Sequence, residues 1–350
     1  MSQNFEKIPL LSLSDAAIST TMRFMDHCTL LALSLQSQKS KNLVRSLNLK
    51  AESVVYVAEF IAFNLSYSRQ TFLSLRLTYS TPWYPIFINI EDPPQTIEIS
   101  HLPDANYPNE VECKWSNKMG PQKWSNHLKF VFNYSNPLRI VFGGSVELDL
   151  QSIRDAFPEI DEIQNMGNSK NVLQTFLSSV KNININRDVF VDQAQVDQKP
   201  KTFQHVSIQN LDRLCLYIVG KINLDDLISM NCRYFATTDH VKIQLKDVNR
   251  FLKGWIRGGN PRLEYMTFWF REPNPSRANI GQVFKGITHQ ILPEDHEQTV
   301  KEHMDDNSIL KMEKKIKGGY SIRNKYGTLA TVKETSGEGF VWRLVIVVWK

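Results

Sequence analysis

The amino-acid sequence predicts an α+β fold in three parts: a small N-terminal module of three helices, a β-rich middle section, and a C-terminal region of alternating helices and strands. Three features predict this order. Apolar residues follow helical spacing at the start of the chain, alternate with polar residues in the middle, and recur in short spaced groups further on. The predicted limits of the three parts are residues 8–50, 51–165 and 166–350.

The three N-terminal helices are predicted from cap residues and apolar faces. Ser14 can cap the first helix, and Asp15 in its first turn suits the positive end of the helix dipole. A turn over residues 26–29 leads into the second helix, and Ser37 can cap the third. One face of the first helix contains Ala17, Ile18, Thr21, Met22 and Met25.

The middle section is predicted to form strands because its hydrophobic residues alternate with mostly polar ones. Proline residues and the Gly143-Gly144 pair separate the alternating stretches, as expected of turns between strands. The stretches contain Leu73, Leu75, Leu77 and Tyr79; Ile86, Ile88 and Ile90; Leu128, Phe130, Phe132 and Tyr134; and Val146, Leu148 and Leu150.

The C-terminal part repeats the apolar spacing L-x-x-L-x-L of leucine-rich repeats. The full signature also requires asparagine or cysteine after the last apolar residue, where this chain has Asp188 and Leu211. The sequence therefore predicts a degenerate leucine-rich-repeat-like α/β region. A further copy is either Leu227, Met230 and Cys232 or a strand over residues 233–238, and the spacing leaves this open. The other copies are Val180, Ile183 and Ile185; Phe203, Val206 and Ile208; and Leu263, Met266 and Phe268.

The last third of the chain contains two predicted helices and a run of strands. An apolar face predicts a helix before Gly258-Gly259 and Pro261, which stop it. Residues 293–317 are predicted to form a charged helix, and residues 320–349 to form strands with a turn at 324–327. The final run, VWRLVIVVW, is apolar enough for a central strand or for one that faces a second layer. The face of the first of these helices contains Val248, Phe251, Leu252, Trp255 and Ile256.

Composition excludes several classes of protein. The net charge of +5 arises from 41 basic and 36 acidic residues spread along the chain, unlike the concentrated basic stripe of a nucleic-acid-binding protein. The four cysteines lie far apart, which argues against a zinc knuckle or a disulfide framework. Glu59 interrupts the longest apolar run, and Asp15 interrupts the N-terminal one, so neither a membrane span nor a signal peptide is predicted. We expect a cytoplasmic or nuclear protein.

The sequence offers no catalytic constellation. It lacks the G-x-x-x-x-G-K-[ST] loop that binds phosphates, and we interpret its cysteines as core residues. His296 and His303 are the best candidate metal ligands, but H-E-x-x-H is absent, and we interpret them as part of a charged, solvated helix face. We therefore expect neither enzymatic activity nor a metal or cofactor.

A basic cluster near the C terminus leaves nucleic-acid binding as a minor alternative. Its lysines and arginine could contact phosphates, and its two tyrosines could stack on bases, although a solvated charged face is the preferred interpretation. Binding of this kind would weaken steeply with salt. The cluster contains Lys311, Lys314, Lys315, Lys317, Tyr320, Arg323, Lys325 and Tyr326.

Two parts of the chain resemble a known family. The run Ile8-Pro9-Leu10-Leu11-Ser12-Leu13, the first helix and LLALSLQSQKSKNLVRSL resemble an F-box, most closely that of the F-box family expanded in nematodes. Ile8 and Ser14 depart from its pattern, which has phenylalanine and proline there. The stretches NLDDLISMNC, DVNRFLKGWIRGGNPRLEY and GGYSIRNKYGTLATV resemble the F-box-associated domain of the same family.

The resemblance implies a substrate-recognition subunit of an SCF-type cullin-RING E3 ubiquitin ligase. Its F-box would bind a Skp-type adaptor, and through it a cullin, while residues 166–350 would recruit an unknown protein substrate. A module of this size rarely sustains its own core, so burial of about 800 Å² against an adaptor would stabilise it. The positions that match the adaptor surface of the family are Pro9, Leu10, Leu13, Ile18, Met22, Leu30, Leu31 and Ser34.

A second interpretation remains open. The chain could be a leucine-rich-repeat-like interaction scaffold with no role in ubiquitination, whose first 50 residues cap the array. Deletion of residues 1–50 would then unfold the remainder, whereas the receptor interpretation predicts a stable fragment.

Overall fold

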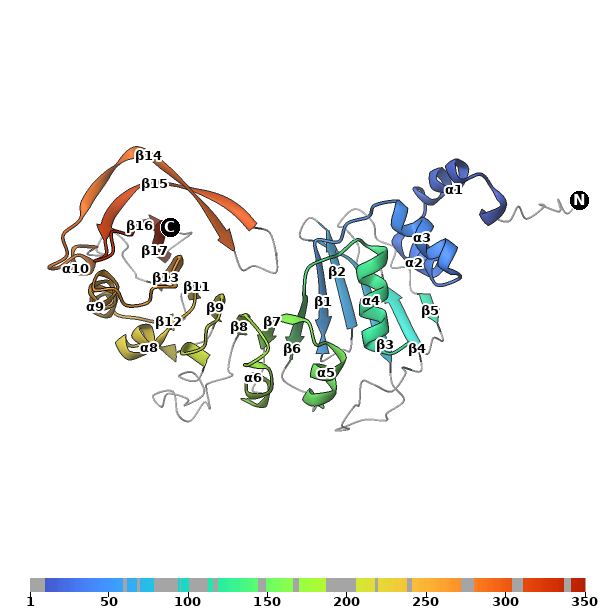
Figure 1. The fold of residues 1–350 in the computed structure, drawn as a ribbon, viewed down its shortest axis with the longest axis horizontal. Helices are drawn as coiled ribbons and strands as arrows, with labels where there is room; N and C mark the ends of the chain where they lie inside the picture. Colours follow the sequence, from blue (N-terminus) through green and yellow to red (C-terminus); the bar gives the residue numbers. More distant parts are fainter. Residues whose placement is uncertain are drawn as a thin grey trace, which may run out of the picture. The chain divides into compact units, whose positions relative to one another are not determined.

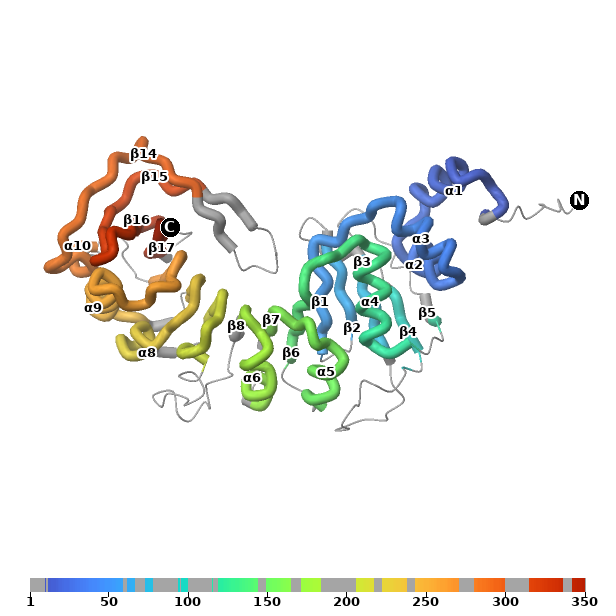
Figure 2. The backbone as a smooth tube through the Cα atoms, viewed as in Figure 1, coloured from blue at the N-terminus to red at the C-terminus, as the bar shows by residue number. Residues whose placement is uncertain are grey.

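The chain divides into two compact units (Figure 1). The N-terminal unit comprises residues 1–138 and 147–158, and the C-terminal unit comprises residues 139–146 and 159–350. Figure 2 traces the backbone of each unit. The predicted limits at residues 50 and 165 stay predictions. The computed structural model describes residues 10–58, 62–67, 70–78, 94, 96–100, 113–115, 119–143, 149–165, 170–186, 206–217, 220–237, 241–271, 280–303, 311–336 and 341–349.

The N-terminal unit begins with short helices that polar side chains cap. The Ser14 side chain accepts a hydrogen bond from the Ala17 N–H, and the Ser37 side chain accepts one from the Ser40 N–H. These two predicted caps are therefore confirmed. Asp26 caps the helix between them, and the sequence analysis did not assign this cap. The elements are η1 (Leu10–Ser12), α1 (Asp15–Met22), α2 (His27–Ser34) and α3 (Gln38–Ser46).

An antiparallel sheet forms the middle of the N-terminal unit. Each strand pairs with the next along the chain, from β1 to β5. Leu73, Leu75 and Leu77 are buried on β3, which confirms the alternation predicted there. Tyr79 and the predicted strand over 86–90 lie outside the described residues. The strands are β1 (Ser53–Val57), β2 (Ala62–Tyr67), β3 (Gln70–Thr78), β4 (Thr96–Ser100) and β5 (Cys113–Trp115).

Helix α4 (Pro121–Val131) replaces the strand that the sequence predicted over residues 128–134. Pro121 stands at the first helical position, where its missing N–H has no intrahelical partner to lose. Trp124, Leu128 and Val131 are buried at helical spacing, whereas the apparent alternation is fortuitous. Helix α4 contacts α3, and α5 (Leu150–Ala156) completes the unit. Leu150 begins this helix instead of ending a predicted strand, and Val146 and Leu148 lie outside the described residues.

The C-terminal unit contains a mixed sheet whose first half is parallel. Strands β7, β8, β9, β11 and β13 pair in parallel, and β6 (Leu138–Phe142) lies beside β7. The helices α6 (Lys170–Phe176), α8 (Leu224–Ser229) and α9 (Leu245–Ile256) alternate with these strands along the chain. The parallel strands are β7 (Ile160–Asn165), β8 (Asn182–Asn186), β9 (Arg213–Tyr217), β11 (Tyr234–Thr237) and β13 (Tyr265–Arg271), with a separate pair β10 (Gly220–Lys221) and β12 (Val241–Lys242).

The second half of this sheet is antiparallel. Strand β17 (Val341–Trp349) pairs with β13 on one side and with β16 (Leu329–Ser336) on the other, so VWRLVIVVW is an interior strand, as predicted. Strands β15 (Lys311–Arg323) and β14 (Gln290–His303) follow, and α10 (Ile280–Val283) precedes them. The helix predicted over 293–317 is therefore wrong, because both of its described ends lie in strands.

The predicted fold class is wrong in two respects. The N-terminal helices do not form a separate small module, because α2 contacts β3 and α3 contacts α4 within one compact unit. The C-terminal region is not a leucine-rich-repeat-like array, because its parallel strands continue into an antiparallel β13-β17-β16-β15-β14 order. Within the predicted array, Val206 and Ile208 precede β9 instead of lying in a strand. The open register resolves in favour of the strand at 233–238, observed as β11.

Helix α9 is the most accurately predicted helix. Val248, Phe251, Leu252 and Trp255 are buried along one face, and the helix ends two residues before Gly258, which has φ +96°. Among the described residues, no helix has both the length and the apolar character that crossing a membrane requires.

Candidate functional site

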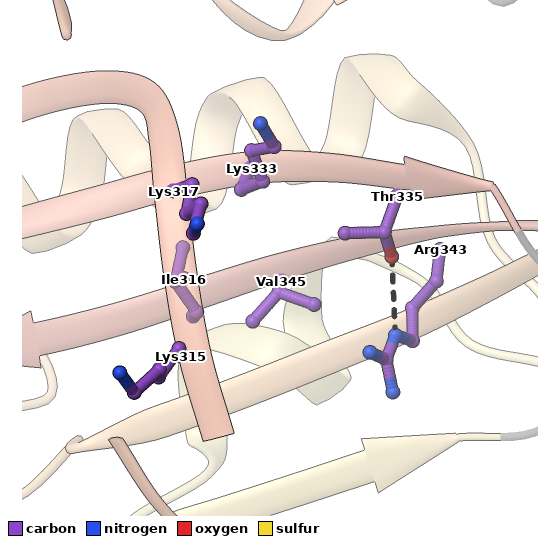
Figure 3. Close-up of a pocket in the computed structure, with 7 residues that line it drawn as sticks. All are labelled: Lys315, Ile316, Lys317, Lys333, Thr335, Arg343 and Val345. Carbon is purple, nitrogen blue, oxygen red and sulfur yellow. Dashed lines mark hydrogen bonds between the residues drawn. The ribbon is translucent and has the colours of Figure 1, made fainter. Parts of the chain in front are cut away.

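A cavity of about 190 Å³ lies in the C-terminal unit between β15 and the strands β16 and β17 (Figure 3). We call it the β15 cavity. Four of its seven lining residues are basic, and the remaining three are a threonine and two aliphatic residues. The lining residues are Lys315, Ile316, Lys317, Lys333, Thr335, Arg343 and Val345.

A bend in β15 creates this cavity. Gly318 and Gly319 have φ values of +63° and +110°, which L-residues with a side chain rarely adopt. A Cβ atom on Gly319 would also lie 2.9 Å from the Val332 carbonyl oxygen. Residues 320–323 pair with β16, whereas residues 315–317 turn and cross over β16 and β17 (Figure 3). The two glycines therefore allow one strand to pair with β16 and then to cover the face of the sheet.

The floor of the β15 cavity is apolar and buried. Ile316 packs in a cluster with Tyr265, Val345 and Val347, which belong to β13 and β17. Figure 3 shows Ile316 and Val345 pointing toward one another. The pairing of Lys333 with Val345 places these two residues on one face of the sheet, because side chains of paired residues point the same way.

Arg343 supplies a buried cation at one end of the cavity. Arg343 is only 7% exposed. Its Nε donates a hydrogen bond of 3.3 Å to Thr335 Oγ1, and its guanidinium carbon lies 5.2 Å from the centroid of the Trp269 ring. An aromatic ring attracts a cation placed over its face. A guanidinium also matches the geometry of carboxylate and phosphate oxygens. Thr335 and Trp269 therefore orient a group suited to an oxyanion.

Three lysines form the rim of the cavity, and glutamates of β14 hold them. Glu297 accepts from Lys315 Nζ at 2.6 Å and from Lys317 Nζ at 3.3 Å, and Glu294 accepts from Lys333 Nζ at 3.1 Å. The hydrogen bond from Lys315 lowers the pKa of Glu297, and the same bond raises the pKa of Lys315. The side chains of Lys315, Lys317 and Glu294 are largely exposed, and those of Lys333 and Glu297 are partly buried. Each pair therefore has an exposed partner, so an incoming anion can exchange with the glutamates.

Other ion pairs of the C-terminal unit join the parallel strands. Glu162 on β7 lies between Arg139 and Arg213, and all three side chains are largely buried. Arg233 donates two hydrogen bonds of 3.0 Å to Glu264, and the Tyr234 hydroxyl donates a third to the same carboxylate. Burial raises the pKa of Tyr234 to about 12. These groups are engaged with one another, so we assign them a structural role.

The predicted adaptor residues are distributed between surface and interior. Pro9 lies outside the described residues, and Leu10 and Leu13 are partly buried. The other five are buried within the chain: Ile18, Met22, Leu30, Leu31 and Ser34. Among the described residues of this region, Phe24, two residues after the end of α1, is a large apolar residue that is 86% exposed. Sequence reasoning missed Phe24, although its position beside Arg23 and outside the apolar face of the helix indicated exposure.

Among the described residues, the candidate nucleophiles and metal ligands do not assemble into a reactive site. Cys28, Cys215 and Cys232 are buried, and burial raises the pKa of Cys232 to about 12, far from the thiolate form that reacts. His296 and His303 both lie on strand β14 instead of on the predicted helix. Among the described residues, no group of three potential metal ligands is found.

A comparison with family models decides part of the predicted resemblance. Residues 202–268 match the family described as F-box associated. The match spans β9 to β13 and includes the predicted stretches 223–232 and 247–265. It does not reach residues 318–332, and no F-box is detected at the N terminus.

The F-box-associated match ends beside the β15 cavity. Its last residue, Phe268, precedes Trp269, the ring that lies against Arg343. The comparison with curated proteins gives no match, and neither does the comparison with solved structures.

Sequence reasoning found only part of the cavity. The basic cluster included Lys315 and Lys317, but Lys333 and Arg343 belong to other strands. One signal could have identified Arg343, because it is the single charged residue within VWRLVIVVW. A charge in an otherwise apolar central strand indicates either an ion pair or a binding site.

Proposed function

We propose that this chain is a substrate-recognition subunit of an SCF-type cullin-RING E3 ubiquitin ligase. In this proposal its N-terminal helical segment binds a Skp-type adaptor, and through it a cullin, while its C-terminal unit recruits a protein substrate. The observation that carries the proposal is the F-box-associated match over β9 to β13. The proposal assigns ubiquitin transfer to other subunits, so this chain is not itself an enzyme. It also places the chain in the cytoplasm or the nucleus.

The N-terminal structure supports an adaptor contact through a small part of the predicted surface. Leu10 and Leu13, which precede α1, and Phe24, which follows it, lie at least partly in solvent, whereas the other five predicted residues are buried. Aromatic residues are enriched in protein interfaces relative to the rest of the surface. The contact is therefore proposed at Leu10, Leu13 and Phe24.

The alternative of a leucine-rich-repeat-like scaffold has lost its structural basis. It depended on a repeating strand-helix array, and the observed sheet changes from parallel to antiparallel at the β13–β17 pair. A terminal cap for such an array is likewise not needed, because the N-terminal helices belong to the other compact unit.

Co-purification with a Skp-type adaptor tests the proposal. We expect the wild-type chain to retain the adaptor, and we expect the double variant Leu10→Asp/Phe24→Asp to lose at least about 90% of it, because charges placed at an interface core remain desolvated. Tyr326→Asp, at a residue 69% exposed in the C-terminal unit, serves as the matched control. Thermal melting of each variant checks that the fold is retained.

Two results would contradict the proposal. One is a wild-type chain that retains no adaptor, and the other is a double variant that retains as much adaptor as Tyr326→Asp. Leu31→Asp is unsuitable for this test, because Leu31 is 0% exposed and a buried aspartate would unfold the N-terminal unit.

A further inference from the structure

We infer that the β15 cavity binds an acidic segment of a protein substrate, in which an oxyanion side chain stands next to an apolar one. The oxyanion is a carboxylate or a phosphorylated residue, and it pairs with Arg343, Lys317 and Lys333. The apolar neighbour lies on Ile316 and Val345. The inference names a substrate class for the proposed receptor and rests on that proposal for its biological setting.

The size of the cavity favours peptide side chains over a small-molecule ligand. Its volume is about 190 Å³. Pockets for cofactors and metabolites usually enclose about 300–1,000 Å³. A smaller cavity of mixed character accommodates one or two side chains of an extended segment, with the rest of the segment lying outside.

The charges of the cavity select an anion. The four charged residues that line the cavity are cations, and Glu294 and Glu297, which pair with its three lysines, lie outside the lining on β14. Arg343 is held in place by Thr335 and Trp269, so little side-chain freedom is lost when it pairs. The side chains of Lys315 and Lys317 are 66% and 60% exposed and can adjust to the ligand, whereas that of Lys333 is 21% exposed.

The apolar floor argues against nucleic acid as the ligand. Ile316 and Val345 offer an aliphatic surface, whereas single-stranded nucleic acid is bound by aromatic residues on which bases stack. Tyr320, one of the two tyrosines near the basic cluster, packs against Phe284 and His289 instead of facing the cavity. An aliphatic residue beside an acidic one therefore fits the lining better than a nucleotide does.

Edge pairing offers no competing route for a peptide. Strand β14 stands at the end of the sheet order and contains Pro293 together with five acidic or basic residues between 294 and 302. Proline and charge at an edge strand discourage the addition of another strand. A segment is therefore recognised through its side chains in the cavity.

Fluorescence anisotropy with the full chain tests this inference. The probes are a labelled octapeptide of alternating Leu and Asp, the same peptide with phosphoserine replacing Asp, a neutral Leu/Asn peptide, and oligothymidine. We expect one or both anionic peptides to bind at low salt more tightly than the neutral peptide and oligothymidine. The tighter anionic peptide identifies the oxyanion.

Charge-reversal variants locate the binding. Lys317→Glu/Lys333→Glu should lower the affinity for the anionic peptide by about tenfold, because two rim cations are replaced by anions that repel it. Lys246→Glu/Lys285→Glu makes the same change in net charge at exposed positions of the same unit and should alter affinity less than about twofold. In reductive methylation, bound peptide should protect Lys317 and leave Lys246 reactive.

Three results would overturn the inference: no binding of either anionic peptide, equal weakening by both double variants, or tighter binding of oligothymidine than of the peptides. The adaptor experiment is independent, because Lys317→Glu/Lys333→Glu leaves Leu10 and Phe24 unchanged. Retained adaptor with no peptide binding refutes the cavity alone. Peptide binding with no adaptor refutes the receptor proposal alone.

Discussion

At the residue scale, a buried hydrogen bond joins the N-terminal helices to α4. Ser34 Oγ and His127 Nε2 are 2.7 Å apart, and both residues are buried. Burial, with a smaller contribution from the charge of Lys41, lowers the pKa of His127 to about 4. The imidazole is therefore neutral in the folded protein at neutral pH.

We predict that His127 destabilises the N-terminal unit in mild acid. Below its ordinary pKa of 6.5, the unfolded chain binds a proton that the folded chain excludes, so the free energy of unfolding falls between pH 6.5 and about 4 and is unaffected above pH 6.5. The loss reaches roughly 3 kcal/mol, at 1.36 kcal/mol per pKa unit. Urea unfolding of wild type and His127→Gln over this pH range measures it.

The variant should reduce the pH dependence, because glutamine keeps an amide near Ser34 and does not titrate. His296→Gln, at an exposed position of β14, is the control and should leave the pH dependence unchanged. Equal pH dependence in wild type and His127→Gln would refute the assignment.

Single residues also show why the candidate site was only partly predictable. Lys315 and Lys317 were recognised because they cluster in sequence with other basic residues. Arg343 joins them through the bend of β15, which brings segments more than twenty residues apart into one cavity. A single sequence shows neighbours along the chain, whereas a cavity depends on neighbours across strands.

At the element scale, β15 is defined by its glycine bend. We predict that Gly319→Ala lowers the free energy of unfolding by about 1–3 kcal/mol, because φ +110° is strained for alanine and its Cβ would meet the Val332 carbonyl. The same variant should weaken binding at the β15 cavity. Urea unfolding and peptide anisotropy measure the two effects.

Gly254→Ala is a control of opposite sign. Gly254 lies inside α9, and no atom lies within 4 Å of a Cβ added there. Alanine should therefore stabilise the protein by about 0.5–1 kcal/mol, because it restricts the unfolded chain and favours the helix. A Gly319→Ala variant as stable as Gly254→Ala would show that the bend does not require glycine.

The accuracy of the element predictions follows from how local each signal is. Caps at Ser14 and Ser37, the apolar face of α9 and the glycine after it are local signals, and the structure confirms them. The charged segment 293–317 was misassigned because opposite charges close in sequence also suit a helix. In the structure they pair across strands, as Glu297 does with Lys315. The spacing of apolar residues wrongly predicted a leucine-rich-repeat-like region, because buried segments of other folds can have the same spacing.

At the scale of the whole molecule, the N-terminal helices are part of the compact unit that contains the antiparallel sheet. Besides the bond between Ser34 and His127, α4 and the residues after it contact α3 and the residues after that helix. Lys41 and Arg45 lie over the Phe130 ring, at 4.6 and 4.1 Å from its centroid. The Asn133 side chain donates to the carbonyl oxygens of Arg45 and Leu49. The N-terminal helices, where the adaptor contact is proposed, therefore also contribute to the stability of this unit.

We predict that deletion of residues 1–50 destabilises the N-terminal unit, contrary to the stable fragment expected from the sequence. The deletion exposes the α4 residues that α2 and α3 cover and leaves the His127 imidazole without Ser34. Hydrogen exchange measured by mass spectrometry should show faster exchange in α4 (residues 121–131) of the fragment 51–350 than of the full chain. Helix α9 (residues 245–256), in the other compact unit, is the internal reference. Unchanged protection of α4 would mean that the N-terminal helices are dispensable for this unit and that their burial contributes little to its stability.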